Sequence, residues 1–277
     1  MGTVHGVYLK YVGLSAISYA GYAYLSGNSS PPPPAMATRS LQLAAPAIPL
    51  WKVAATVVLG YSALINGAIA VLFKMERGMG LLGKDRVTGK IPAWSYVVFF
   101  PFHLPTLLYT HIHTRHSKMK ATNAKGEKEK VLVPVASEVK PGWWVGGWYA
   151  NELDRDWAGV IDLTVEFPER CINRTQAYLS LPTWDGVPAS PEQLEKAATF
   201  AIEARKKGDV LIHCAHGRGR STTVMCAAMV KAGMYNNYEE ALEQGIKPGR
   251  PVCKLNSLMK KSLAAWQAEY IDGKKGQ

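Results

Sequence analysis

One short stretch constrains the fold of this chain more than any other, the run HCAHGRGRST from His213 to Thr222. An apolar run, DVLIH, precedes it at 209–213, and a compact helical pattern, TTVMCAAMVK, follows at 222–231. The stretch is therefore predicted to be a glycine-rich loop between a buried strand and a helix. Such a loop aims successive backbone N–H groups, together with the positive end of the helix dipole, at one point. We expect it to bind an anion.

Two side chains of this loop could act on the bound anion, one as a nucleophile and one as a phosphate-binding cation. Cys214 stands at its start, where the field of a helix N-terminus stabilises a thiolate and lowers the thiol pKa from about 8.5. Arg220 follows six residues later. Its planar guanidinium can hold two phosphate oxygens at once, which a lysine cannot. The pattern predicts a nucleophilic cysteine facing a bound phosphate.

The chain around the loop alternates between strand and helix patterns. A helix is expected from Ser190 to about Lys207, because the sequence SPEQ at its start has the pattern of a capping box with proline in the first turn. We therefore expect an α/β fold in which helices flank a central sheet. The short β-type runs begin at Trp143, Gly159, Ala177 and Asp209.

These residues resemble the signature loop of the cysteine-dependent protein tyrosine phosphatase superfamily, H-C-x5-R-[S/T]. The similarity extends over about residues 138 to 270 and is to the small dual-specificity branch, which also includes phosphoinositide phosphatases and the mitochondrial phosphatidylglycerophosphate phosphatase. The resemblance implies that Cys214 attacks phosphorus to form a phosphocysteine and that Arg220 holds the equatorial oxygens. It also implies that Ser221 assists release of the thiolate and that His213 orients the loop. The other phosphate-binding positions that it implies are Ala215, His216, Gly217, Arg218 and Gly219.

The same resemblance implies a general acid on a mobile loop upstream of the cysteine. Asp185, in the stretch LPTWDGVPAS, fits this role because it lies 29 residues before Cys214 and precedes the helix that begins at Ser190. An Asp-Gly pair also makes a turn, and this remains the alternative for Asp185. Weaker candidates for the acid are Asp162, Glu166 and Glu169.

A second stretch, GRPVCKLN from Gly249, resembles the arginine-proline segment of the family and the asparagine that follows it near the last helix. We expect Arg250 and Asn256 to support the signature loop without reacting. The last helix is expected to start at about Leu255. Leu263 and Trp266, at helical spacing within it, are expected to lie in the core.

Three further cysteines, Cys171, Cys226 and Cys253, are expected to be small buried side chains. The four cysteines form no CxxC pair and show no metal-ligand spacing with the seven histidines. The sequence thus indicates neither a zinc site nor a disulfide framework, and we expect no metal and no organic cofactor.

The positive charge of the chain is concentrated in its first half. Residues 1–130 hold 14 Lys and Arg against 4 Asp and Glu, a net charge of +10, whereas residues 131–277 hold 18 against 17. No acidic residue precedes Glu76. This distribution favours contact with anionic lipid head groups and argues against nucleic acid as a partner.

A membrane-anchoring region is predicted over residues 1–113. The run 53–73 has 21 residues without a charge, enough for a helix to cross the roughly 30 Å hydrocarbon layer of a bilayer. A first span over about 8–26 is shorter and rich in tyrosine, so an interfacial helix and the apolar part of a cleaved signal remain alternatives. An organelle transit peptide is a further alternative for this acid-free N-terminus.

A third apolar run, 91–112, contains Pro101 and Pro105, which break a straight helix. We expect a re-entrant or surface-lying segment there, with cationic flanks on the cytoplasmic side. Residues 114–137 are expected to form a basic linker, and 138–272 a catalytic domain of the dual-specificity phosphatase-like type. The expected location is a membrane, with the catalytic domain in the cytosol; an organelle membrane remains an alternative.

The expected function is hydrolysis of phosphomonoesters by a membrane-anchored phosphatase that acts on tyrosine, serine or threonine phosphoproteins. An anionic phospholipid, either a phosphoinositide or phosphatidylglycerophosphate, is the alternative substrate. Membrane attachment favours the lipid, and His216 and Arg218 could meet its additional negative charge or could equally face solvent. A catalytically inert phosphate-binding module is the alternative from another class of protein.

Overall fold

The computed structural model describes residues 6–27, 48–122 and 128–273. The chain divides into two compact units, one made of Tyr8–Met75 and the other of Glu76–Gln277 together with the first seven residues. Residues 76–113 were expected to belong to the anchoring region. The structure groups them with the unit that contains the sheet.

The smaller unit is a pair of helices, α1 (Val7–Gly27) and α2 (Leu50–Lys74). The two helices contact one another, and Ser15 Oγ of α1 donates a hydrogen bond to the carbonyl oxygen of Ala63 in α2 at 2.7 Å. A helix was expected over 8–26, and α1 occupies that position. Within the described part of the chain, α2 is the one helix that is long and apolar enough to cross a membrane, by length and composition alone.

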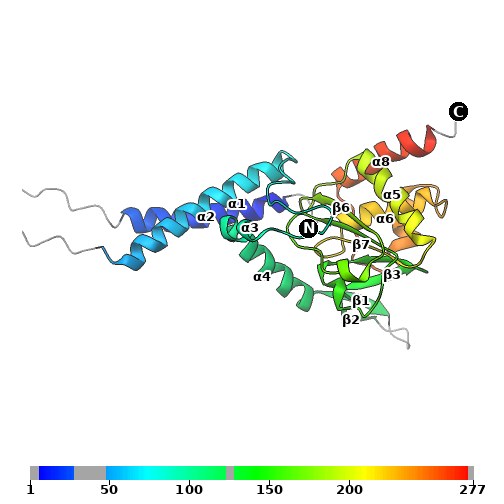
Figure 1. Ribbon diagram of the computed structural model, residues 1–277, viewed down its shortest axis with the longest axis horizontal. Coiled ribbons are helices and arrows are strands. Elements are labelled where there is room, and N and C mark those ends of the chain that lie inside the picture. Colours follow the sequence, from blue (N-terminus) through cyan, green and yellow to red (C-terminus); the bar gives the residue numbers. More distant parts are fainter. Residues whose placement is uncertain (1–5, 28–47, 123–127, 274–277) are drawn as a thin grey trace, which may run out of the picture. The chain divides into compact units, whose positions relative to one another are not determined.

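The larger unit is built on a five-stranded sheet in the order β3-β4-β7-β5-β6 (Figure 1). The β3 and β4 strands pair antiparallel, whereas β4 with β7, β7 with β5, and β5 with β6 pair parallel. The sheet is therefore mixed, with four parallel strands and the antiparallel β3 at one edge. The strands are β3 (Ala136–Lys140), β4 (Trp143–Gly146), β5 (Gly159–Thr164), β6 (Tyr178–Thr183) and β7 (Val210–His213).

Helices cover one face of this sheet. The predicted capping box at Ser190 is present, since its hydroxyl accepts from Gln193 N and the Gln193 side chain accepts from Ser190 N. Leu263 and Trp266 are fully buried in the main core, as expected. The helices are α5 (Pro191–Arg205), α6 (Arg220–Lys231), the short α7 (Tyr238–Glu240) with the π-helical η3 (Ala241–Ile246), and α8 (Ser257–Gln267) with η4 (Ala268–Asp272).

The side chains of the parallel strands alternate between the two faces of the sheet, and both faces are covered by other parts of the protein. Ile161 and Ile212 enter the main core with α5 and α6. Their neighbours Val160 and Leu211 enter a second cluster with Trp157 on the opposite face. That face is bordered by the short helices η1 (Trp148–Glu152) and η2 (Ile172–Arg174). This two-sided burial explains why the strands read as apolar runs in the sequence.

The expected re-entrant segment 91–112 forms two helices of the larger unit, α3 (Ala93–Val98) and α4 (Phe100–His116). The helices separate at Phe99, whose backbone leaves the helical region. Pro101 lies in the first turn of α4, where its missing N–H costs no hydrogen bond, while α4 continues through Pro105.

The expected linker 114–137 contains regular structure. It holds the end of α4, a hairpin of β1 (Lys118–Thr122) and β2 (Lys128–Leu132), and the start of β3. Residues 123–127 between the hairpin strands lie outside the described residues.

Candidate active site

The signature loop connects the end of β7 to the start of α6, in the centre of the sheet. The α6 helix begins at Arg220, two residues earlier than the sequence pattern predicted. Gly217 adopts a φ of +64°, and a Cβ atom there would lie 2.5 Å from the carbonyl carbon of Gly146. Only glycine fits this position, because both the backbone conformation and the space exclude a side chain.

Backbone N–H groups of this loop are available to a ligand. Among the residues that the structure describes, the N–H groups of residues 215–219 donate to no protein acceptor. Backbone N–H groups that meet no protein acceptor can donate to a bound ligand. Since the donors precede the N-terminus of α6, a tetrahedral oxyanion is the partner that fits them best.

The candidate nucleophile Cys214 is only 3% exposed and lies at the start of the loop. Its Sγ atom is 3.4 Å from Oγ of Ser221. Burial alone would raise the pKa of Cys214, but the charge of Arg220 and hydrogen bonds from Ser221 outweigh it and lower the pKa below its ordinary value. The thiolate is therefore favoured where it is needed as a nucleophile.

Arg220 is fixed by four hydrogen bonds before any ligand binds. Its Nη1 donates to the carbonyl oxygens of Leu163 at 3.0 Å and Thr183 at 2.6 Å. The carboxylate of Glu166 accepts from both terminal nitrogens, from Nη2 at 2.6 Å and from Nη1 at 3.2 Å. Burial opposes the charge of Arg220, but Glu166 raises its pKa above the ordinary value. The buried Nε atom has no hydrogen-bond partner among the described residues, which leaves a donor for phosphate.

The candidate acid Asp185 lies beside this guanidinium. Its Oδ1 atom is 3.5 Å from Nη2 of Arg220, and its side chain is 38% exposed. The loop around it is held on both sides, by Trp184 Nε1 donating to the carbonyl oxygen of Arg77 at 2.7 Å and by Asn256 Nδ2 donating to that of Gly186 at 2.9 Å. Asp185 is thus exposed enough to reach a bound ester while it remains close to the phosphate site.

The three weaker acid candidates have other partners. Glu166 binds Arg220, as described above. Glu169 lies with Oε2 2.6 Å from Nε2 of His213, and Asp162 forms a buried ion pair with Lys84. Each is buried and paired, so the geometry favours Asp185 as the proton donor over all three.

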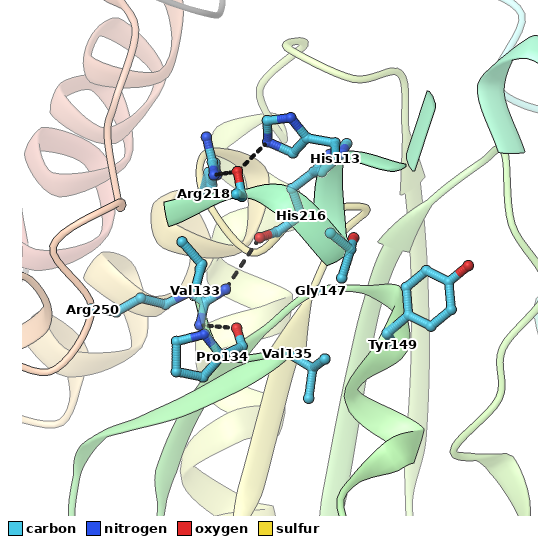
Figure 2. A pocket seen from close by; sticks show the side chains of 11 residues that line it. His113, Val133, Pro134, Val135, Gly147, Tyr149, His216, Arg218 and Arg250 are labelled. Carbon is cyan, nitrogen blue, oxygen red and sulfur yellow. Dashed lines mark hydrogen bonds between the residues drawn. The ribbon is translucent and has the colours of Figure 1, made fainter. Parts of the chain in front are cut away.

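Arg250 holds the signature loop by hydrogen bonds to its backbone carbonyl groups, the supporting role expected from the sequence. Its Nε donates to the carbonyl oxygen of Gly217 at 2.8 Å and its Nη2 to that of His216 at 3.2 Å. Its Nη1 donates to the carbonyl oxygen of Pro134 at 2.9 Å. Figure 2 shows Arg250 between these two segments of chain. By engaging the loop carbonyls, Arg250 leaves the loop N–H groups free for an anion.

Two side chains of the signature loop lie against α4 and the residue that follows it. The ring of His216 contacts those of His113, at a centroid distance of 4.6 Å, and Tyr109, at 5.7 Å. Arg218 donates from Nη2 to Ser117 Oγ at 2.6 Å (Figure 2). Burial lowers the pKa of His216 to about 3, so this side chain is neutral at physiological pH. The side chains of His216 and Arg218 contact protein, which weakens the sequence-based argument that they meet additional substrate charge.

A buried charged network behind the loop includes a residue that sequence reasoning missed. Lys84 donates to the carboxylate of Asp162, and also to the carbonyl oxygen of Thr164 at 2.7 Å and its Oγ1 at 2.9 Å. Burial would raise the pKa of Asp162, but Lys84 and His213 lower it to about 2. The available signal was Asp162 itself, because a carboxylate within an apolar strand requires a cationic partner.

The network continues to the residue next to the nucleophile. Burial opposes a charged His213, but Glu169 and Asp162 raise its pKa to about 9, so the imidazole is protonated at neutral pH. Ligand atoms of Asp162, Glu169 and His213 lie within 4.8 Å of one another, a spacing that could hold a metal ion. The Lys84 ammonium already contributes positive charge to this cluster.

The remaining cysteines are free and buried, as predicted. Burial raises the pKa of the thiols of Cys171 and Cys226, and that of Cys253 to about 11. The pKa of Cys214 is therefore shifted down, whereas the pKa values of the other three cysteines are shifted up.

No family model and no curated protein matches the chain at a significant level. Solved structures similar to it are phosphatases. The crystal structure of Tk-PTP in the active form is 26% identical, with a TM-score of 0.44, over 49% of this chain and 98% of that chain. Human DUSP28 is 20% identical, with a TM-score of 0.41, over 49% and 94%. PTPMT1 is 19% identical, with a TM-score of 0.42, over 51% and 99%.

Proposed function

We propose that this chain is a membrane-anchored phosphatase that hydrolyses phosphomonoesters through a phosphocysteine intermediate. The observation that carries the proposal is the arrangement of Cys214, Arg220 and Asp185 around a loop whose N–H groups are unpaired within the described residues. A nucleophile with a lowered pKa, a fixed cation and an exposed carboxyl group supply the three functions that the reaction requires.

In the first step, Sγ of Cys214 forms a bond to phosphorus while the bond from phosphorus to the ester oxygen breaks. The loop N–H groups and Arg220 hold the three equatorial oxygens and stabilise the charge that develops on them. Asp185 gives its proton to the ester oxygen, which leaves as an alcohol. The product of this step is the phosphocysteine.

In the second step, a water molecule attacks the phosphocysteine and Asp185, now a carboxylate, accepts its proton. The bond from phosphorus to sulfur breaks, and inorganic phosphate is released. Ser221, with Oγ 3.4 Å from Sγ, donates a hydrogen bond that stabilises the departing thiolate. Cys214 thereby returns to its starting state.

The proposal is tested by phosphate release from p-nitrophenyl phosphate with the purified full-length protein, compared with Cys214→Ser. We expect turnover by the parent and none by the variant, and an acid-quenched peptide that contains Cys214 should carry one phosphoryl group. Cys226→Ser, at a buried cysteine of α6, is the matched control and should retain activity. A protein that binds vanadate without releasing phosphate would instead be the inert binding module.

Phosphoproteins are the first substrate class that we propose, and a membrane phospholipid is the second candidate. The apolar helix α2 favours the lipid, because an enzyme held at a bilayer meets phospholipids at high local concentration. A panel of tyrosine, serine and threonine phosphopeptides, set against phosphoinositides and phosphatidylglycerophosphate in mixed micelles, separates them by kcat/KM. The class with the higher kcat/KM is the substrate.

The proposed location follows from α2, which we infer crosses a membrane with the sheet-containing unit in the cytosol. The protein should remain in the membrane fraction after alkaline carbonate extraction. A protease added to the cytosolic side should cleave near both Arg86, which is exposed, and the C-terminus. Cleavage of these two sites from opposite sides would contradict this topology.

A further inference from the structure

The helices α3 and α4 share an exposed apolar face. Ten large apolar side chains on these two short helices are between 37% and 73% exposed. So many exposed apolar side chains on two helices that contact one another are unusual on a soluble protein and mark an interaction site. The residues are Trp94, Tyr96, Val97, Val98, Phe100, Leu104, Leu107, Leu108, Tyr109 and Ile112.

The opposite face of the same helices is packed within the larger unit. Phe102 is fully buried, and its ring meets that of Trp184 edge-on at a centroid distance of 5.8 Å. Ser95 and His103 are also buried, with Ser95 Oγ 3.2 Å from His103 Nε2. Further along α4, His111 Nδ1 lies 3.0 Å from the hydroxyl of Tyr149. The exposed face is therefore presented by a fixed element and not by a detached segment.

The segment of chain that carries this face holds charges of one sign. No acidic residue occurs between Arg86 and Gly126, and exposed cations flank the two helices at both ends. These cations are Arg86 and Lys90 before α3, and Lys118 and Lys120 after α4. Aromatic and aliphatic side chains bordered by Lys and Arg are the composition of helices that lie in the head-group region of an anionic bilayer.

We propose that the α3–α4 face is a membrane-docking surface that lies in the head-group region of an anionic bilayer. Two observations favour a bilayer over a second copy of the chain. The same positive flanks would face one another in a symmetric dimer but would meet opposite charge on anionic lipids. The connection from Lys74, where α2 ends, to Ala93 is also only 18 residues long, which tethers the face to any bilayer that contains α2.

Docking would place the catalytic loops beside the lipid surface. At its first turn α4 contacts Trp184, the neighbour of Asp185, and further along it contacts His216 of the signature loop. The helix that meets the lipid thus also borders the acid loop and the phosphate loop. The docking surface itself does not depend on the proposed reaction.

The test places a fluorophore on the face in the full-length protein. Cys214→Ser removes the reactive thiol, the other cysteines are buried, and Leu104→Cys or Leu108→Cys then provides a single exposed thiol for an environment-sensitive NBD label. Leu258→Cys on α8 is the matched control, at an exposed leucine of the same unit. The labelled proteins are reconstituted into vesicles of phosphatidylcholine with phosphatidylserine.

We expect blue-shifted emission from labels at 104 and 108, but not at 258. Lipids spin-labelled near the head group should quench them about twofold more than lipids labelled near the chain end, as for an interfacial helix. Three outcomes would overturn the proposal. The labels at 104 and 108 could emit like the label at 258, they could be quenched more strongly by the deep spin label, or they could show a blue shift without quenching by lipid. Equal quenching without phosphatidylserine would overturn the role given to charge. Carbonate extraction of the same samples reports separately on α2.

Discussion

At the scale of single residues, the lowered pKa of Cys214 separates it from the other three cysteines. Burial raises the pKa of all four thiols, and Arg250 and Thr222 oppose it at Cys253, but only at Cys214 do a guanidinium and a hydroxyl outweigh burial. We expect iodoacetate at pH 6 to 7 to alkylate Cys214 alone, because the other thiols remain protonated. Peptide mapping by mass spectrometry measures this selectivity.

Free cysteine provides the control for that experiment. The rate of inactivation should stay high as the pH falls below the range in which the free thiol loses reactivity, and phosphate or vanadate should protect the enzyme. Alkylation of Cys214 with the pH dependence of free cysteine would contradict the lowered pKa.

Asp185 makes a second prediction at this scale. Asp185→Asn should lower kcat for an alkyl phosphate by about 10² to 10⁴, the usual contribution of general acid catalysis. The effect should be small for p-nitrophenyl phosphate, whose leaving group needs no proton. Asp209→Asn, at an exposed aspartate paired with Arg155, is the matched control. An equal loss on both substrates would remove Asp185 from the acid role.

The buried histidine His213 makes a third prediction, on stability. Its pKa is raised from 6.5 to about 9 in the folded state, so its charged form stabilises the fold. This contribution is fully present below pH 6.5 and is lost as the pH rises through about 9. We expect the free energy of unfolding from urea titrations to fall between pH 7 and 10, and His213→Gln to flatten this dependence. A parent whose stability does not change over this range would contradict the prediction.

At the scale of elements, the signature loop depends on a left-handed glycine. Gly217→Ala should cost about 1–3 kcal/mol of stability from backbone strain and should also lower kcat, because the loop must shift away from Gly146. Gly233 also has a positive φ, of +72°, but a Cβ there meets nothing within 4 Å. Gly233→Ala should therefore destabilise without a change in kcat, as measured by urea unfolding and steady-state kinetics.

The central strands and the helices that follow them could be predicted because their patterns are local. Apolar runs such as that of β7 are bounded by turn residues, and the α5 start carries its own cap. The β3 strand and the β1–β2 hairpin could not be predicted from pattern. Their sequences ASEVK, KMKAT and KEKVL are short and polar, and they become strands by pairing with a neighbouring strand, β1 with β2 and β3 with β4.

The residues of the candidate site also divide into those that the sequence could predict and those that it could not. Cys214, Arg220 and Ser221 could be predicted because they are close in sequence and their spacing reflects the geometry of a loop. The partner of Arg220, Glu166, was ranked only as a weak acid candidate, and Lys84 was not identified at all. Their contacts join residues 54 and 78 positions apart, and no sequence pattern marks such pairs.

At the scale of the whole molecule, Lys84 joins the segment before the sheet to β5. Both side chains of its ion pair with Asp162 are buried, and removing one partner of a buried pair typically costs about 3–5 kcal/mol. Lys84→Met should destabilise the protein by that order in urea unfolding, and it should lower activity through the Asp162–His213–Glu169 network. Lys196→Met, at an exposed lysine of α5, should change neither.

The position of Lys84 also sets a lower limit on the size of a fragment that could be active. A protease cut between Lys84 and β3 would leave Asp162 buried without its covalently held counter-charge, even though every signature residue stayed on the larger fragment. Under the proposed function, release of the C-terminal half from the α1–α2 unit would then abolish activity instead of producing a free active domain.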